Sequence, residues 1–303
     1  MVFTLSALTE GLRQQSVSAV EALPGNGLVV QADDGAPAVL SDSQLDPATL
    51  LAAQSTGQVT ELGIATVRAG ADNRNATVAA FGRSDVHSVT VSPSVADDLS
   101  LAVGDTVRIG DEALRVEQVA DVGQYAHQPV IEMPVATWQQ VTGRDHVNAL
   151  IADRAPADLP GAVWVERSAV TDLVPGYSSE HMSLLLIQGL LLIVSAVVVG
   201  GFFAVWTGQR VGSLAVVRAM GAGRWYLLRD GLGQAVLVLV GGLAVGALLG
   251  FGLVSLLSGK APVAIDPATM ALVLGGMGAL GLIGAGLSLR PLVKVDPLTA
   301  LNR

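Results

Sequence analysis

Three long stretches without a charged residue constrain the fold of this chain more than any other feature. They cover residues 182–208, 231–259 and 267–289. A helix needs ~20 mainly apolar residues to cross the ~30 Å hydrocarbon core of a bilayer, and each stretch is longer than that. Buried helices of soluble proteins are rarely uncharged over such a length, and three in succession are rarer still. The sequence therefore predicts three transmembrane helices at these positions.

The distribution of charge divides the chain into two different halves. Residues 1–182 hold 23 of the 26 acidic residues and 9 of the 17 basic ones, whereas residues 183–303 carry a net charge of +5. This division predicts an acidic water-soluble domain followed by a membrane domain. The expected fold class is a membrane protein with an α-helical transmembrane bundle of three spans and an N-terminal extracytoplasmic α+β domain over residues 21–180. The sequence has no cysteine, which excludes disulfides and a thiolate nucleophile.

The basic connection between the first two stretches predicts the orientation in the membrane. Residues 209–230 contain four arginines and one aspartate, and the tail 290–303 has a net charge of +2. Positive loops stay on the cytoplasmic side, so both segments are expected in the cytoplasm and residues 1–182 outside. The expected location is the plasma membrane, as a multi-pass protein of bacterial type.

Alternating and β-branched runs in the first half predict strands, and turn-forming residues separate them. The expected strands cover residues 27–31, 60–69, 76–82, 87–92, 106–109, 113–119 and 147–152. Two of them, 106–109 and 113–119, flank Gly110-Asp111-Glu112 and predict a hairpin. Short helices are expected over 92–101 and 134–143, and a longer one over 10–23. Strands and helices alternate irregularly, which favours an α+β domain.

The sequence contains no recognisable catalytic or nucleotide-binding motif. Neither G-x-x-x-x-G-K-[ST] nor G-x-S-x-G occurs, and no histidine lies in an H-E-x-x-H pattern. The chain is therefore not expected to be an enzyme or to hold a cofactor or metal itself. One alternative stays open: Glu180-His181-Met182, at the edge of the first span, could ligate haem iron or a metal.

The predicted spans contain no ionisable residue, and Gln188 and Gln234 are their most polar side chains. Ion-coupled carriers usually need an ionisable group at membrane depth, so this class of function is disfavoured. Gly242, Gly246 and Gly250 follow a small-xxx-small spacing that lets helices approach closely. These glycines pack either the chain's own bundle or a homodimer seam.

The segment from Arg210 to Gly250 resembles the signature region of FtsX-like ABC transporter permeases, the MacB/FtsX group. A basic segment that ends in Arg218-Ala219-Met220-Gly221-Ala222 precedes a glycine-rich span, as in that family. The tail, with Arg290-Pro291-Leu292 and Asp296-Pro297, is similar to the family's closing pattern. Residues 104–123 also resemble part of its extracytoplasmic domain.

This resemblance implies a homodimer or pseudo-dimer and a separate ATPase subunit, which binds the ATP and grips a cytoplasmic helix between two spans. Carried onto this chain, that coupling helix covers roughly residues 209–224 of the cytoplasmic segment 209–230. The coupling positions are Arg210, Val211, Leu214, Ala215, Arg218, Ala219, Gly221, Ala222 and Arg224.

The family also has a span before its external domain, which makes four in all. Residues 1–8 are too short to cross a bilayer, so residues 1–20 are expected to be the remnant of that span and its connector. The true start is then expected upstream of Met1.

The predicted function is that of the permease subunit of an ABC transporter, which transmits ATP-driven motion to its external domain. The expected cargo is an amphipathic compound: haem, a lipid, a lipopeptide or an antimicrobial peptide. The alternative is a non-transporting regulator that passes ATPase motion to an external cell-wall hydrolase. The lipid bilayer is an expected partner and nucleic acid is not.

Overall fold

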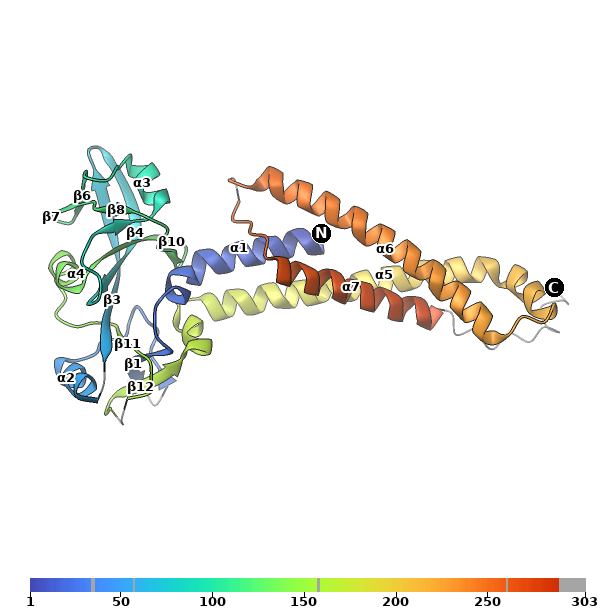
Figure 1. Cartoon of the computed structure of the whole chain (residues 1–303), viewed down its shortest axis with the longest axis horizontal. Coiled ribbons are helices and arrows are strands. Elements are labelled where there is room, and N and C mark those ends of the chain that lie inside the picture. Colours follow the sequence, from blue (N-terminus) through green and yellow to red (C-terminus); the bar gives the residue numbers. More distant parts are fainter. Residues whose placement is uncertain (34–35, 57, 157–158, 260, 289–303) are drawn as a thin grey trace. The chain divides into compact units, whose positions relative to one another are not determined.

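The computed structural model describes residues 1–33, 36–56, 58–156, 159–259 and 261–288. The chain forms two compact units (Figure 1). One comprises residues 12–182 and is called the sheet unit; the other comprises residues 1–11 and 183–303 and is called the membrane unit. The boundary between the units at Met182 lies where the first uncharged stretch begins.

The sheet unit is built on a single mixed β-sheet. The described strands follow the order β12-β1-β11-β3-β4-β10-β5-β8, with β2, β6, β7 and β9 attached at its margins. Their bounds are β1 Gly27–Asp33, β2 Ala36–Pro37, β3 Val59–Ala71, β4 Arg74–Arg83, β5 Thr90–Val91, β6 Thr106–Ile109, β7 Glu112–Arg115, β8 Gln118–Val119, β9 Gln124–Tyr125, β10 Gln128–Pro134, β11 Ala149–Ala152 and β12 Ala162–Glu166. The helices of this unit are α2 Pro47–Thr56, α3 Pro93–Leu99, α4 Val135–Thr142 and the 3-10 helix η1 Arg167–Leu173.

The long hairpin β3–β4 forms the centre of the sheet. Its antiparallel register runs from Leu62 opposite Arg83 to Ala71 opposite Arg74, and β10 joins β4 in parallel. The α4 helix packs on this hairpin through Trp138, whose side chain is fully buried and donates a hydrogen bond of 3.0 Å from Nε1 to the Ala80 carbonyl. Glycines at positions 63 and 82 make room for the indole, because a Cβ at either position would collide with it.

A buried asparagine ties the loop before α2 to the centre of the sheet. The Asn148 side chain accepts a hydrogen bond of 2.6 Å from the Ile64 N–H and donates to the carbonyls of Ser41 and Ser43. The Ser43 hydroxyl donates in turn to the Asn148 carbonyl. Every polar group of this buried side chain is therefore satisfied, as burial requires.

Most of the expected elements of the sheet unit are present. The hairpin around Gly110 forms as β6 and β7, with Ile109 opposite Glu112. Two expectations were wrong in extent. The strand expected over 87–92 is reduced to Thr90–Val91, because β5 pairs with β10 and with β8 at these two residues only. Residues 118–119 leave the hairpin and pair with β5 as the separate strand β8.

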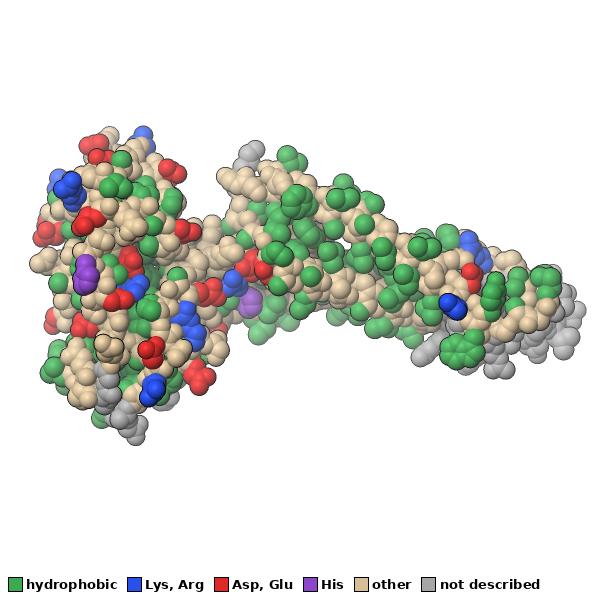
Figure 2. Space-filling view, in the orientation of Figure 1, with side chains coloured by type: hydrophobic (Ala, Val, Ile, Leu, Met, Phe, Trp, Pro, Cys, Tyr) green, Lys and Arg blue, Asp and Glu red, His purple; other side chains and the backbone are tan. Residues whose placement is uncertain are grey.

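The membrane unit consists of long apolar helices, as the sequence predicts. They are α5 Tyr177–Ala219, α6 Arg224–Leu257 and α7 Pro267–Ser288, and the stretches apolar enough to span a membrane are Tyr177–Arg210, Arg229–Leu257 and Pro267–Leu287. Large hydrophobic side chains such as Leu237 and Leu248 are exposed along them, and Figure 2 shows hydrophobic side chains over much of the surface of these helices. Helices with this surface satisfy their own backbone hydrogen bonds and are suited to a lipid environment.

The first half of α1 (Val2–Glu21) packs within the membrane unit. Phe3 fills the space beside Gly250 of α6, and Ala7 forms a small core with Val254 and Met270. The Gln188 side chain of α5 donates a hydrogen bond of 2.6 Å to the Ser6 hydroxyl. Helix α1 is longer than the helix expected over residues 10–23, and the identity of residues 1–20 as part of a membrane span stays a prediction.

Candidate coupling site

The connection between α5 and α6 is a tight turn that we call the α5–α6 turn, residues 220–223. Helix α5 ends at Ala219, Gly221 has a φ of 101°, and α6 begins at Arg224. The Ala222 N–H donates back to the Val217 carbonyl over 3.3 Å, a six-residue closure of the kind that ends helices with a left-handed glycine. The helical segment is therefore broken at Gly221-Ala222-Gly223.

The segment expected as a separate coupling helix has a different form. Residues 209–219 continue α5 without interruption, and residues 224–230 are the beginning of α6. Because no residue before Gly221 interrupts α5, residues 209–219 extend the first span and do not form a helix of their own. Any force applied at the turn therefore acts directly on the ends of α5 and α6.

A chain of polar contacts joins these two helix ends. Arg210 of α5 donates a hydrogen bond of 2.5 Å from Nη1 to the Gln234 Oε1 of α6, and the Gln234 side chain donates over 2.9 Å to Asp230. The Arg210 guanidinium also lies 4.5 Å from the centre of the Trp206 ring, a cation–π contact. Arg210 thus fastens α5 to α6 through groups that the sequence prediction did not pair.

Exposed apolar side chains surround the α5–α6 turn. Met220 is 76% exposed and Trp225 is 84% exposed, and the neighbouring Tyr226 is exposed as well. Gly221 and Ala222, two of the predicted coupling positions, belong to the turn itself and not to a helix. Side chains at the other predicted coupling positions lie outside the described part of the structure; these positions are Val211, Leu214, Ala215, Arg218, Ala219 and Arg224.

The glycines predicted to pack helices have different surroundings. Gly250 contacts Phe3 of α1, whereas no described atom lies within 4 Å of a Cβ built at Gly242 or Gly246. Close helix approaches occur at glycines that the sequence analysis did not single out. Gly200 of α5 meets Gly284 of α7, and Gly281 of α7 meets Leu239 of α6. Whether Gly242 and Gly246 face a second copy of the chain stays a prediction.

Two of the three candidate haem or metal ligands near the first span, Glu180 and His181, contact other side chains. Glu180 Oε2 lies 3.1 Å from Nε2 of His127, and the His181 ring stacks on Tyr177 with 5.3 Å between ring centres. Among the described residues, no group of three His, Cys, Asp or Glu side chains is arranged to hold a metal ion.

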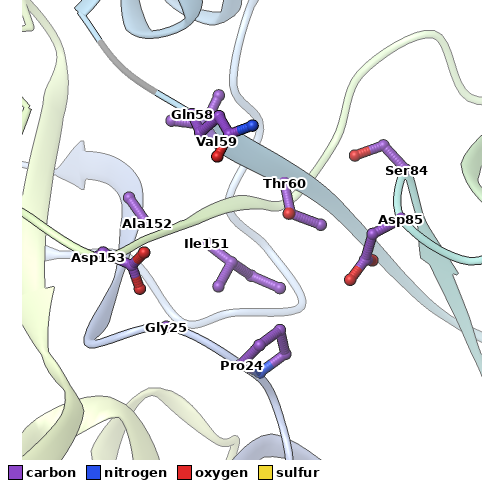
Figure 3. A pocket seen from close by; sticks show the side chains of 10 residues that line it. All are labelled: Pro24, Gly25, Gln58, Val59, Thr60, Ser84, Asp85, Ile151, Ala152 and Asp153. Atoms are coloured by element: carbon purple, nitrogen blue, oxygen red, sulfur yellow. The ribbon is translucent and has the colours of Figure 1, made fainter.

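A pocket of about 380 Å³ opens at one edge of the sheet unit (Figure 3). The ends of β3, β4 and β11 and the loop before β1 form its walls. Its polar lining includes Thr60, Ser84, Asp85 and Asp153.

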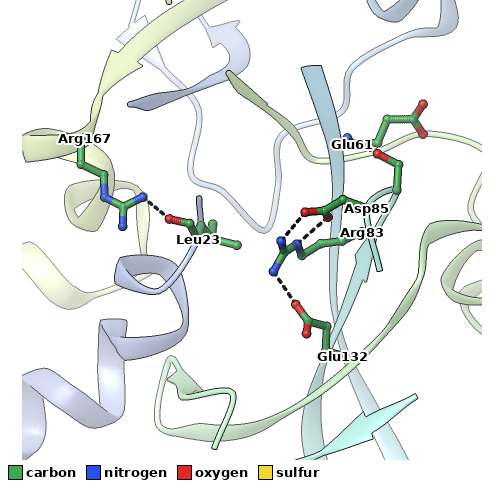
Figure 4. A network of polar contacts seen from close by, with 7 residues as sticks. Leu23, Glu61, Arg83, Asp85, Glu132 and Arg167 are labelled. Carbon is green, nitrogen blue, oxygen red and sulfur yellow. Dashed lines mark hydrogen bonds and ion pairs between the residues drawn. The ribbon is translucent and has the colours of Figure 1, made fainter. Parts of the chain in front are cut away.

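Beside this pocket, Arg83 joins two carboxylates of the sheet unit (Figure 4). Its guanidinium contacts Asp85 at 2.6 Å and Glu132 at 2.7 Å. Burial lowers the pKa of Arg83, because it disfavours the charged guanidinium. The hydrogen bonds and negative charges of Asp85 and Glu132 have the larger opposite effect, so the pKa of Arg83 lies above its ordinary value. On the neighbouring strand, burial raises the pKa of Glu61. Through these contacts Arg83 links the end of β4 to Glu132 of β10.

Comparison with known proteins finds similarity to transport permeases. Residues 185–297, which include the α5–α6 turn, match the model of the FtsX-like permease C-terminal region. Over 328 residues the chain is 24% identical to a Staphylococcus haemolyticus protein that bears the name of a hemin transport system permease, HrtB; this covers 100% of the chain and 92% of the relative. It is 27% identical over 331 residues to an uncharacterized ABC transporter permease of Mycobacterium bovis, with 100% and 91% covered.

Among solved structures, the chain is similar to the periplasmic region of MacB from Actinobacillus actinomycetemcomitans. The sequence identity is 10% and the TM-score is 0.37, with 53% of this chain and 96% of that chain covered. Residues 185–297 thus match the FtsX-like permease C-terminal region, and over its whole length the chain is similar to proteins named as transport permeases.

Proposed function

We propose that this permease converts ATP hydrolysis by a separate ATPase subunit into movement of its extracytoplasmic domain. Residues 209–230 are the cytoplasmic surface that the ATPase engages, with the α5–α6 turn at its centre. The permease acts as a homodimer, as the family resemblance implies.

The contact from Arg210 through Gln234 to Asp230 is the observation that carries this proposal. It fastens the ends of α5 and α6 on either side of the turn. A displacement of the turn is then shared by two spans rather than absorbed in a flexible loop. The exposed Met220 and Trp225 give an apolar partner surface at the same place, and aromatic residues and methionine are enriched where proteins bind one another.

The proposed cargo is an amphipathic compound, with hemin as the first candidate. Three relatives that align with the whole chain bear the name of a hemin transport system permease. Hemin combines a large apolar ring with charged propionates, so it partitions into the bilayer surface from which such a permease would remove it. A lipid, a lipopeptide or an antimicrobial peptide has the same amphipathic character.

The test is ATP hydrolysis by the full permease purified with its partner ATPase subunit and reconstituted in lipid. We expect hemin to stimulate hydrolysis, and cells without the permease to become sensitive to hemin. Hydrolysis unaffected by hemin but stimulated by a lipopeptide would reassign the cargo within the same mechanism. Failure of the two proteins to copurify, together with hydrolysis independent of the permease, would refute the proposed function.

A further inference from the structure

Residues 123–128, which include β9 and the connection to β10 and are called the β9–β10 turn, donate backbone N–H hydrogen bonds to helix α1. The Ala126 N–H donates to the Ser16 carbonyl over 2.9 Å, and the His127 N–H donates to the Gln15 carbonyl over 3.0 Å. Gln124 N–H donates to the Ser18 hydroxyl over 2.8 Å. Three successive contacts of this kind hold the β9–β10 turn on one side of α1.

The conformation of the turn is one that its residues rarely adopt. Tyr125 pairs with Gln128 across a two-residue connection, and Ala126 and His127 have φ values of 47° and 62°. Two-residue hairpins with positive φ at both positions normally contain asparagine, aspartate or glycine. Strained backbone of this kind persists only where the surrounding structure enforces it, and it clusters at functional positions. Here the hydrogen bonds to α1 hold Ala126 and His127 in the left-handed conformation.

The His127 side chain extends the contact from α1 to α5. Its Nε2 lies 3.2 Å from the Ser16 hydroxyl of α1 and 3.1 Å from Oε2 of Glu180 in α5. An ionised carboxylate only accepts hydrogen bonds, so Nε2 carries the donated proton. The Ser16 side chain is buried, whereas His127 and Glu180 are 44% and 35% exposed. The imidazole therefore bridges two helices at a solvent-exposed position, where water can take over its hydrogen bonds.

The bridged helices are also the two covalent connections between the units of the protein. The chain passes from the membrane unit to the sheet unit between Gly11 and Leu12, and back between Met182 and Ser183. Both positions lie inside helices, α1 and α5. A contact that holds α1 and α5 together therefore restrains both chain connections between the spans and the sheet.

The geometry points to the β9–β10 turn as a latch, with His127 as a positioning residue that holds α1 and α5 together in the resting state and releases them when the ATPase drives the spans. This inference rests on the proposed function and names the contact that must open. The weakness of the exposed His127–Glu180 pair suits a contact that opens and closes in each cycle, because exposed ion pairs contribute little to stability.

The distance between α1 and α5 tests the latch in the full permease bound to its ATPase. The sequence lacks cysteine, so spin labels at Gln14→Cys and Ser179→Cys report that distance alone, with labelled chains diluted among unlabelled ones. Without nucleotide we expect one narrow distribution for the parent protein. Removing the latch side chains by His127→Ala with Ser18→Ala should shift the nucleotide-free distribution to longer and broader distances. The matched control, His87→Ala with Ser94→Ala elsewhere on the sheet unit, should leave it unchanged.

The nucleotide arm separates the latch from the proposed function. With ATP trapped in the ATPase, the parent should move to the distribution that the latch variant shows at rest. A latch variant identical to the parent without nucleotide would overturn the latch, whatever ATP does. If ATP leaves the distance distribution of the parent unchanged while the latch variant still shows longer distances, the proposed coupling is refuted but the latch is supported.

Discussion

Replacing Gly221 with alanine is expected to remove most of the hemin-stimulated ATP hydrolysis of the reconstituted complex. The residue has a φ of 101°, and its turn closes through the hydrogen bond from Ala222 to Val217. An L-residue held in a left-handed conformation costs about 1–2 kcal/mol, so the turn will relax toward a continuous helix and displace the coupling surface. A loss of about 1.4 kcal/mol in coupling corresponds to a tenfold loss of stimulation.

Gly212→Ala is the matched control for this substitution. Gly212 lies in the same helix, its φ is not positive, and no described atom lies within 4 Å of an added Cβ. Alanine there should preserve stimulation and slightly stabilise α5, because glycine inside a helix costs roughly 0.5–1 kcal/mol relative to alanine. Full stimulation in Gly221→Ala, measured with the complex intact, would show that the geometry of the turn does not matter for coupling.

Replacing Trp138 with alanine is expected to cause the largest loss of stability in the sheet unit. The indole is fully buried between α4 and the β3–β4 hairpin, and its Nε1 is bonded to the Ala80 carbonyl. Removal of a buried tryptophan leaves a cavity and costs about 3–5 kcal/mol. Hydrogen exchange of the β3 and β4 amides in the full chain measures this loss directly, because these amides are protected only while the hairpin stays packed.

A double-mutant cycle makes the same prediction sharper. A Cβ at Gly63 would lie 2.5 Å from the ring carbon Cε3 of Trp138, and its other close contacts are ring atoms too. Gly63→Ala should therefore destabilise the parent but cost little once Trp138→Ala has removed the ring. Strictly additive effects would show that the indole does not occupy the space above Gly63.

The positions of the spans and of the helix break could be predicted from the sequence, because local composition decides both. An uncharged stretch longer than a bilayer is thick leaves few alternatives to a membrane helix, and α5, α6 and α7 coincide with the three stretches. The break at Gly221 follows from glycines placed between two helical segments. The hairpin of β6 and β7 was predictable for the same reason, since its turn residues lie next to its strands.

Contacts between distant segments could not be predicted. Nothing in the local sequence pairs Gln234 with Arg210, although an amide inside an apolar span was a sign that it has a polar partner. The turn at Ala126-His127 gives no sequence signal either, because its left-handed conformation is imposed by α1 and not by asparagine or glycine. The parallel pairing of β10 with β4 likewise joins segments that are about fifty residues apart.

The most direct measurement of the central claim is covalent capture of the ATPase from the α5–α6 turn. A photo-crosslinking amino acid placed at Met220, in the full complex in membranes, should capture the ATPase subunit, and more of it when ATP is bound. The same amino acid at Val103, which is similarly exposed on the sheet unit, should not capture it. Capture at Val103 and none at Met220, with the complex intact, would contradict the assignment of this turn as the coupling surface.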